Sequence, residues 1–505
     1  MATKPISQCP SWSLSLSDLS PELLDLIFKQ LLVIDTRTLA NARQLSRRFE
    51  HIVTPIQFDT VRLNERIIAP ETETYFPRIP KIMSSFTRHI DARSDLDPIN
   101  TRRVLDRAHC LLTLRWRYVG YQLNSGFFST PSDILSSNHV NIETIKLYVE
   151  GLPLKDFDCG LHNTYLQEIP ASNLVSLKME SPTPPLTARS ESLKELLIIS
   201  QGVDTFHYDD RGQGTHFSFR GDERLPAFKE LSLRSYDWNH DRAAVRRHWN
   251  FERLRRLTLI DVPLLQFLSS VPSSDLYRLE ALHCEDFSTH LPDCRREISE
   301  SLYLLTMQIR ALHTLKLTCD TDSFPIHGIL HHAESLRVLS FRDYVGFGDE
   351  TELCPTMHHE ELATLSKRLS NLHTIELDMD PAVCDSVLFL RALCDFPRLD
   401  TLVLHTQTVV LRPYKTVYDT ADPDYAAAAE TFSDLLCYKQ GRPWRSITIN
   451  VGGWKPIMVR RISHAWRELN SRGIYAERCF VLERDGETDE ITIRDEKGVD
   501  NIQIQ

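Results

Sequence analysis

A short pattern of apolar and variable positions recurs along the chain. It reads apolar, two variable, apolar, one variable, apolar, as in LHTLKL and LRVLSF. Twelve copies begin 19 to 45 residues apart, at positions 111, 142, 174, 193, 228, 254, 279, 312, 336, 372, 399 and 444. The alternation at the end of each copy predicts a strand with one buried face.

Several of the intervals between copies carry helical spacing instead. Examples are Leu302, Leu305, Ile309 and Leu312, and then Val383, Val387, Leu390 and Leu393. Each unit is therefore predicted to be a strand, a turn and a helix. Three core side chains contribute ~1.5–3 kcal/mol each, whereas ordering ~30 residues costs about 1.5 kcal/mol apiece, so a single unit cannot fold alone. The pattern predicts an α/β solenoid with a parallel concave sheet; an α/β domain with ordinary parallel strands is the alternative.

The N-terminal segment has a different, purely helical pattern. Asp18 or Ser20 can cap a helix whose first turn holds Pro21. Two apolar stripes follow, first Leu23, Leu24, Ile27, Phe28 and Leu31, then Leu39, Ala42, Leu45, Phe49 and Ile52, with Pro55 expected to end the second. Two or three short helices in a small bundle are predicted, and at ~40 residues such a bundle needs a packing partner.

These patterns divide the chain into segments. We expect a disordered tail over 1–17, a helical module over 18–66, the solenoid over 67–482 and an acidic C-terminal tail over 483–505. Within the solenoid, 203–224 is predicted to be a hairpin insertion and 406–424 a loop insertion. Aromatic residues alternate on both sides of the turn in the first insertion, where they either anchor a partner or pack back onto the solenoid.

Composition narrows the function classes. The 505 residues are 42% hydrophobic and 25% charged, which is typical of a globular protein. The net charge of −11 opposes attraction to phosphate, so a nucleic-acid partner is not expected. The 11 cysteines include no CxxC pair, which favours reduced thiols in an intracellular protein, cytoplasmic or nuclear. No apolar stretch is long enough to span a membrane.

Motifs for catalysis or cofactor binding are not found in the sequence. It contains no GxGxxG, no GxxxxGK[ST], no GxSxG and no HExxH. Two adjacent histidine pairs, at 331–332 and 358–359, lack a carboxylate at ligand spacing. We therefore expect no enzyme activity, no cofactor and no metal site.

The six-residue pattern resembles the leucine-rich repeat family, whose motif reads LxxLxLxxN/CxL. The resemblance covers roughly residues 105 to 480 and is good for the first six positions, whereas the Asn position is mostly missing, as in the degenerate repeats of fungal proteins. It implies parallel strands that line a concave recognition face.

The N-terminal residues resemble the F-box, the adaptor-docking module of cullin-type ubiquitin ligases. The F-box pattern reads LPxELLxxIFxxL, followed by an Asp-Leu step and a basic-aromatic helix. This sequence matches it except that Ser20 stands at the usual proline position and Pro21 follows one residue later. The resemblance implies docking to a Skp adaptor, and through it to a cullin, by Leu19, Pro21, Glu22, Leu23, Leu24, Ile27, Phe28, Leu31, Asp35, Leu45 and Phe49. A helical cap that covers the first repeat is the alternative.

The variable positions inside each strand motif are predicted to face the groove. The candidates for substrate binding are Arg115, Arg117, Lys146, Tyr148, Lys178, Arg234, Arg256, His283, Lys316 and Arg342. Basic residues come early and acidic residues late, which favours a polar protein segment as substrate. One alternative is a solvated face that binds nothing. Another is that the basic side chains pair with carboxylates on neighbouring strands.

An F-box followed by leucine-rich repeats is the arrangement of substrate receptors. The sequence therefore predicts the substrate-recognition subunit of a Skp-cullin-F-box ubiquitin ligase that binds an unknown protein substrate. The alternative is a leucine-rich-repeat scaffold for protein interactions without a role in ubiquitination.

Overall fold

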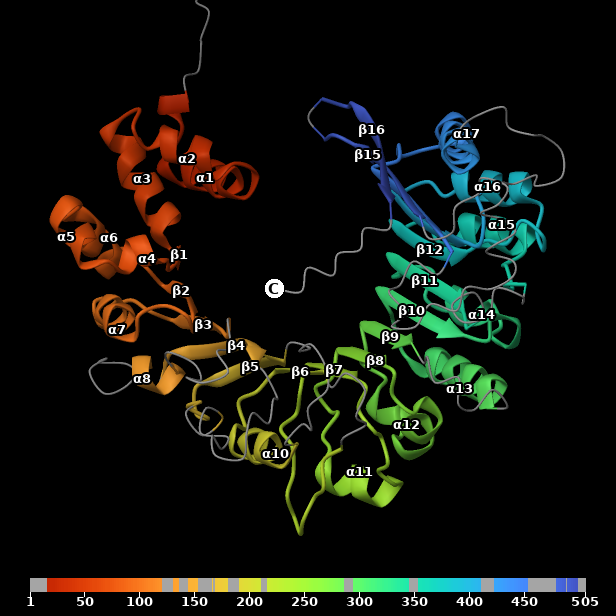
Figure 1. The fold of residues 1–505 in the computed structure, drawn as a ribbon, viewed down its shortest axis with the longest axis horizontal. Coiled ribbons are helices and arrows are strands. Elements are labelled where there is room, and N and C mark those ends of the chain that lie inside the picture. The colour runs from red at the N-terminus through yellow and green to blue at the C-terminus, as the bar shows by residue number, and fades with distance from the viewer. Residues whose placement is uncertain are drawn as a thin grey trace, which may run out of the picture. The chain divides into compact units, whose positions relative to one another are not determined.

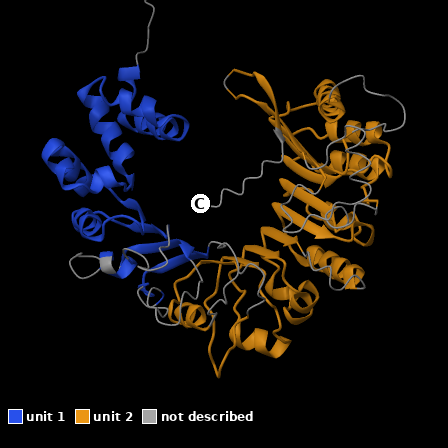
Figure 2. Cartoon of the chain, viewed as in Figure 1, with its two compact units in different colours: residues 1–180 blue, residues 181–505 orange. Residues whose placement is uncertain are grey.

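The protein is described from a computed structural model with an α/β architecture. It describes residues 16–119, 130–135, 144–152, 166, 169–179, 190–209, 216–285, 294–344, 353–409, 422–452, 478–486 and 488–497. The chain divides into two compact units, Met1–Glu180 and Ser181–Gln505, coloured separately in Figure 2. The predicted tail over 1–17 lies outside the described residues except for its last two positions, which begin a short 3-10 helix, Leu16–Asp18.

Unit 1 starts with helices and continues with strands that alternate with helices. Its described helices are α1 (Pro21–Ile34), α2 (Thr36–Ala42), α3 (Arg47–Phe58), α4 (Glu65–Ile68), α5 (Pro70–Tyr75), α6 (Arg78–Phe86), α7 (Pro98–Asp106) and α8 (Pro131–Leu135). Its described strands are β1 (Thr60–Arg62), β2 (His89–Arg93), β3 (Thr113–Arg117), β4 (Lys146–Leu152) and β5 (Leu174–Met179).

Unit 2 repeats the alternation of strand and helix over a longer stretch. The strands described in it are β6 (Thr205–Asp209), β7 (Glu230–Arg234), β8 (Arg256–Ile260), β9 (Ala281–Glu285), β10 (Thr314–Cys319), β11 (Val338–Asp343), β12 (Thr374–Asp378), β13 (Thr401–Thr406), β14 (Ser446–Val451), β15 (Arg478–Arg484) and β16 (Ile491–Lys497). The helices are α10 (Ser190–Ile199), α11 (Arg242–His248), α12 (Leu264–Ser270), α13 (Arg295–Gln308), α14 (His327–Leu330), α15 (His359–Arg368), α16 (Ser386–Cys394) and α17 (Pro423–Tyr438).

The strands of each unit lie side by side in the order of the chain. In unit 1 the sheet runs from β1 to β5, and its neighbouring strands are parallel. In unit 2 the strands from β6 to β14 are parallel, whereas β15 and β16 close the series as an antiparallel pair. The prediction of a mixed α/β fold with a parallel sheet is confirmed at this level.

The strand motif builds the core because its side chains alternate between the two faces of the sheet. In β10, for example, Leu315 and Leu317 are buried while Thr314 and Lys316 are partly exposed. Figure 1 shows the helices of unit 2 on one side of its parallel strands, where they cover the leucine face. The other face, which we call the open face, carries the variable positions of the motif.

One copy of the motif does not form a strand. LKELLI at 193 lies in α10, because Leu193, Leu196 and Leu197 are spaced for one face of a helix and are all buried. Lys194 is fully buried in this helix, and its ammonium bonds Glu191 at 2.9 Å and Glu223 at 2.7 Å. Five described strands were missed by the motif search: β1, β2, β6, β15 and β16.

The hairpin predicted over 203–224 is wrong. Its first arm is β6, which pairs in parallel with β7, and the described residues 216–220 form no strand. The aromatic residues pack inward: Phe206 stacks on Phe217 at 6.3 Å between ring centroids, and Phe219 stacks on His248 at 4.6 Å. Of the two uses considered for these aromatics, packing back onto the unit is the one observed.

Three further boundaries differ from the prediction. Helix α3 continues through Pro55 to Phe58, since Val53 and Ile56 both face the core of the module. The predicted acidic tail contains β16 and the end of β15, which pair with each other. The loop over 406–424 lies mainly outside the described residues, and α17 starts at Pro423 behind an Asp422 cap.

Candidate protein-interaction surfaces

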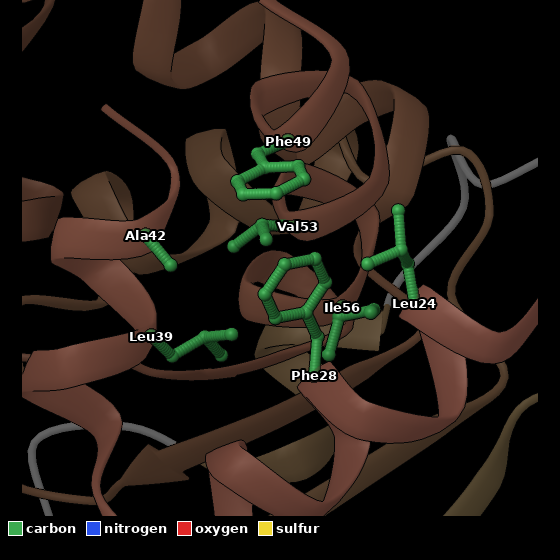
Figure 3. Close-up of a cluster of buried hydrophobic side chains, with 7 residues drawn as sticks. All are labelled: Leu24, Phe28, Leu39, Ala42, Phe49, Val53 and Ile56. Carbon is green, nitrogen blue, oxygen red and sulfur yellow. The ribbon is translucent and has the colours of Figure 1, made fainter. Parts of the chain in front are cut away.

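The first three helices pack around a small apolar core (Figure 3). It consists of Leu24, Phe28, Leu39, Ala42, Phe49, Val53 and Ile56, all buried. Phe28 and Phe49 meet edge to face, with ring centroids 5.3 Å apart, which adds to the area they bury. These residues give α1, α2 and α3 a core of their own.

Capping residues fix where each of these helices begins. Ser20 caps α1 and accepts a hydrogen bond from the N–H of Leu23 at 3.4 Å. Asp35 caps α2 through the N–H of Arg37 at 2.8 Å, and Ser46 caps α3 through the N–H of Phe49 at 3.1 Å. Hydrogen bonds from Thr38 and Arg37 hold the pKa of the Asp35 carboxyl below its usual range.

Arg48 joins the start of α3 to the segment before α1. Its guanidinium donates to the carbonyl oxygen of Leu19 at 2.6 Å and also to that of Ser17. The basic-aromatic run of the sequence therefore has two structural roles here, because Arg48 ties the backbone and Phe49 fills the core.

Helix α1 has a second apolar face that the described residues leave uncovered. At 100° per residue the five side chains of this face lie within an arc of about 120°, on the side of the helix opposite to the core. They are between 40% and 82% exposed. We call this surface the α1 stripe: Leu23, Leu26, Ile27, Val33 and Ile34. An apolar stripe of about 16 Å on one helix is typical of an interaction surface.

The predicted adaptor residues fall into two groups in the structure. Leu24, Phe28 and Phe49 lie in the core, so they cannot contact an adaptor directly, and Leu19 and Leu31 pack partly against that core. Asp35 caps a helix. Besides Asp35, the exposed members are Pro21, Glu22, Leu23, Ile27 and Leu45. Sequence reasoning missed Leu26, Val33 and Ile34, although their spacing from Leu23 was available as a signal.

On the open face of unit 1 the predicted basic residues pair with carboxylates. Arg115 lies 3.6 Å from Glu150 and 4.0 Å from Asp91, and Arg117 lies 3.1 Å from the same Glu150. The register places Arg115 beside Tyr148 and Thr113 beside Lys146. Lys146 and Lys178 form no ion pair within 4.0 Å among the residues described. Much of the basic charge predicted for this end is therefore neutralised by neighbouring strands.

Pairs of histidine and carboxylate mark the open face of unit 2. His207 bonds Glu230 at 2.7 Å, His283 bonds Glu285 at 2.7 Å, and Arg256 approaches Glu230 at 3.3 Å. Arg234 pairs with Asp209 at 3.7 Å across neighbouring strands. Lys316 is partly exposed beside them. This surface is polar and nearly balanced in charge.

Arg342 was predicted to bind substrate, and the structure contradicts this prediction. Its guanidinium is buried and donates twice to Asp378 Oδ1, at 3.0 and 2.7 Å, so it is not available to a ligand. Nearby, His405 bonds Glu376 at 2.8 Å. Burial alone would raise the pKa of Glu376, but hydrogen bonds from His405 and Ser340, with the charge of Arg342, lower it to about 2.

The paired histidines also have structural partners. His332 is buried, accepts from the N–H of Leu312 at 3.2 Å and bonds the carbonyl oxygen of Thr306 at 3.1 Å. His358 caps α15 in a capping box with Glu361. Within the described ranges no three His, Cys, Asp or Glu side chains are grouped as metal ligands. No helix described here is long and apolar enough to cross a membrane.

We compared the chain with known protein families and with curated protein sequences. No protein-family model matches the chain, and no curated protein sequence matches it.

Proposed function

We propose that this chain is the substrate-recognition subunit of a Skp-cullin-F-box ubiquitin ligase. In this proposal the helical module docks the Skp adaptor, and the strand-helix array binds the protein to be ubiquitinated. The observation that carries the proposal is the α1 stripe, because it leaves large apolar side chains exposed beside a core that is already complete.

An adaptor would cover this stripe. Burying a Leu, Ile or Val side chain contributes ~1.5–3 kcal/mol, so five such side chains can supply most of the energy of a stable complex. Leu45, in the turn before α3, is a further apolar side chain of the module that is 74% exposed. Residues 19–49 resemble the F-box, and this resemblance favours the Skp adaptor as the partner that binds the α1 stripe.

We further propose that the array is a leucine-rich-repeat-like solenoid whose open face holds the substrate. Parallel sheets are usually covered on both faces, and a parallel sheet with one polar open face is typical of stacked strand-helix repeats. The substrate candidates retained are Arg115, Arg117, Lys146, Tyr148 and Lys178 on the open face of unit 1, and Arg234, Arg256, His283 and Lys316 on the open face of unit 2. The chain would contribute proximity, since holding a target beside the conjugating enzyme makes the transfer effectively intramolecular.

Co-purification from cells tests the proposal. The tagged wild-type chain should recover the Skp adaptor and a cullin, as measured by quantitative mass spectrometry. L23E/I27E places two charges on the stripe and should reduce that recovery at least tenfold, because a buried unpaired carboxylate is strongly unfavourable. The matched control is I99E/L112E, which changes two exposed apolar residues of unit 1 outside the stripe.

The result depends on both variants staying folded, which their thermal melting monitored by circular dichroism checks. If wild type recovers neither adaptor nor cullin, the ligase role is wrong and a scaffold without that role becomes the better account. Equal losses in the stripe variant and in the control variant would also contradict docking through the stripe.

A further inference from the structure

The strands of unit 2 start along one edge of the sheet, and the residue before each strand lies on that edge. A ladder of backbone hydrogen bonds joins these residues: Glu280 N–H to Arg255 O at 2.7 Å, His313 to Glu280 at 2.8 Å, Arg337 to His313 at 2.9 Å, and His373 to Arg337 at 2.8 Å. Their side chains therefore follow one another at the inter-strand spacing of about 4.8 Å. We call this surface the strand-start edge.

Two hollows open along the strand-start edge and share His313. The first, of about 660 Å³, lies at the starts of β9 and β10, and Arg255, Arg278 and Arg310 line it together with Tyr277. The second, of about 440 Å³, lies at the starts of β11 and β12 and includes Arg337 and Arg398 in its lining. Neither hollow belongs to the α1 stripe or to the open face.

The lining of these hollows is strongly basic in a chain that is acidic overall. Five arginines stand against two carboxylates, Glu280 and Glu334, whereas the whole chain carries a net charge of −11. All five arginines are exposed. Arg255 lies 3.4 Å from Glu280, but Arg310 and Arg337 have no carboxylate within 4.0 Å among the residues described. The edge thus presents guanidinium groups that are available to an anion.

Neighbouring groups orient some of these arginines. Arg398 donates to Asn371 Oδ1 at 2.9 Å, which directs the guanidinium along the second hollow. Arg278 lies over the ring of Tyr277 at 5.1 Å from its centroid, in the first hollow. An arginine that is already oriented loses less rotamer entropy when it binds a carboxylate.

We propose that the strand-start edge binds an acidic, Asp/Glu-rich segment of a partner protein. The arginines are distributed along the edge, from β8 to β13, and do not converge on one point, so they fit a ligand whose negative charge is repeated along its length. From β8 to β12 the edge spans about 19 Å, which matches about six residues of an extended segment. Guanidinium forks bind carboxylates through paired N–H···O bonds, and hollows of this size admit Asp and Glu side chains.

The remainder of the chain favours a protein segment over a nucleic acid. A nucleic acid carries charge far beyond one edge, and a net charge of −11 would repel it. A short acidic segment avoids this repulsion because it contacts only the basic edge. The proposal is independent of adaptor docking, since it rests on residues of unit 2 alone.

Fluorescence anisotropy with the full-length chain tests this inference. The probe is a fluorescein-labelled 12-residue peptide of alternating Glu and Ser, compared with the same peptide carrying Gln in place of Glu. We expect only the Glu peptide to bind, and its affinity to fall between about 50 and about 300 mM NaCl because the contacts are electrostatic. R310E/R337E should weaken binding at least tenfold.

The matched control is R246E/R247E, which makes the same charge change at two exposed arginines of α11 and should alter the affinity less than twofold. Melting followed by circular dichroism checks that both variants are folded. The inference is overturned if wild type binds neither peptide, or if both variants weaken binding equally. It is also overturned if a 12-nucleotide RNA, or a Gln/Ser peptide with one phosphoserine, binds more tightly than the Glu peptide through Arg310 and Arg337.

Discussion

At the residue scale, neighbouring apolar residues in α1 have opposite roles. Leu24 lies in the core of the module, and Leu23, one position earlier, is half exposed on the α1 stripe. The sequence pattern placed both on one functional surface, because a helix that is apolar on two sides shows nearly continuous hydrophobic spacing. Which side meets the rest of the chain depends on Leu39, Phe49 and Val53, which come from other helices.

This difference gives a stability prediction. L24A should lower the free energy of unfolding of the helical module by about 2–5 kcal/mol, because it leaves a cavity in a closely packed core. L23A should change it by at most about 0.5 kcal/mol, since that side chain is exposed. Urea unfolding followed by circular dichroism measures both, and comparable effects would mean that the core has been assigned to the wrong side of α1.

At the scale of elements, the strand motif predicted most strands and failed where helix and strand spacing coincide. LKELLI satisfies both patterns over six residues, and the structure places it in α10, where the ammonium of Lys194 bonds Glu191 and Glu223. Strand β6 was mistaken for a hairpin arm because its alternating aromatics stand beside a turn signal. Its parallel partner, β7, lies more than twenty residues away in the sequence, which local patterns do not reveal.

His332 connects three elements and gives a pH prediction. It follows α14 and bonds the last turn of α13 and Leu312, two residues before β10. Burial first, then the charge of His331, lowers its pKa from 6.5 to about 4. Between pH 6.5 and 4 the unfolded chain binds a proton that the folded chain does not, so stability falls as pH falls. One such group contributes at most about 1.4 kcal/mol per pH unit.

We expect the thermal midpoint of the wild type to fall from pH 7 to pH 5, and H332Q to show a smaller fall. The fall is not abolished, because burial also lowers the pKa of His240 to about 4. H327Q, at an exposed histidine of α14, is the control and should keep the slope of the wild type. If the thermal midpoint of H332Q fell with pH as steeply as that of the wild type, His332 would not be a group that causes the pH dependence.

At the scale of the whole molecule, the sequence predicted the class of fold more reliably than its surfaces. Alternating leucines indicate strands with one buried face, because burial of that face dictates the period. The helical spacing between the copies then indicates parallel strands covered by helices. They do not indicate which polar side chains remain available. Arg117 pairs with Glu150, and Arg342 is buried with Asp378, through contacts between strands that are far apart in the sequence.

The strand-start edge was missed for a related reason. Its five arginines come from separate strand-helix units, such as those of Arg255 and Arg337, and lie far from one another in the sequence. Only the side-by-side order of the strands gathers them. In this chain the pattern within a repeat predicts the core, whereas the stacking of repeats creates the surfaces.

The most direct test of the account is the affinity of the purified full-length chain for a purified Skp adaptor, measured by isothermal titration calorimetry. We expect a one-to-one complex with a Kd below about 1 µM for wild type, with a negative heat-capacity change from burial of the α1 stripe. L23E/I27E should weaken it at least a hundredfold, and I99E/L112E should leave it unchanged. No measurable binding of wild type, or equal binding by all three proteins, would contradict the proposal that the α1 stripe docks an adaptor.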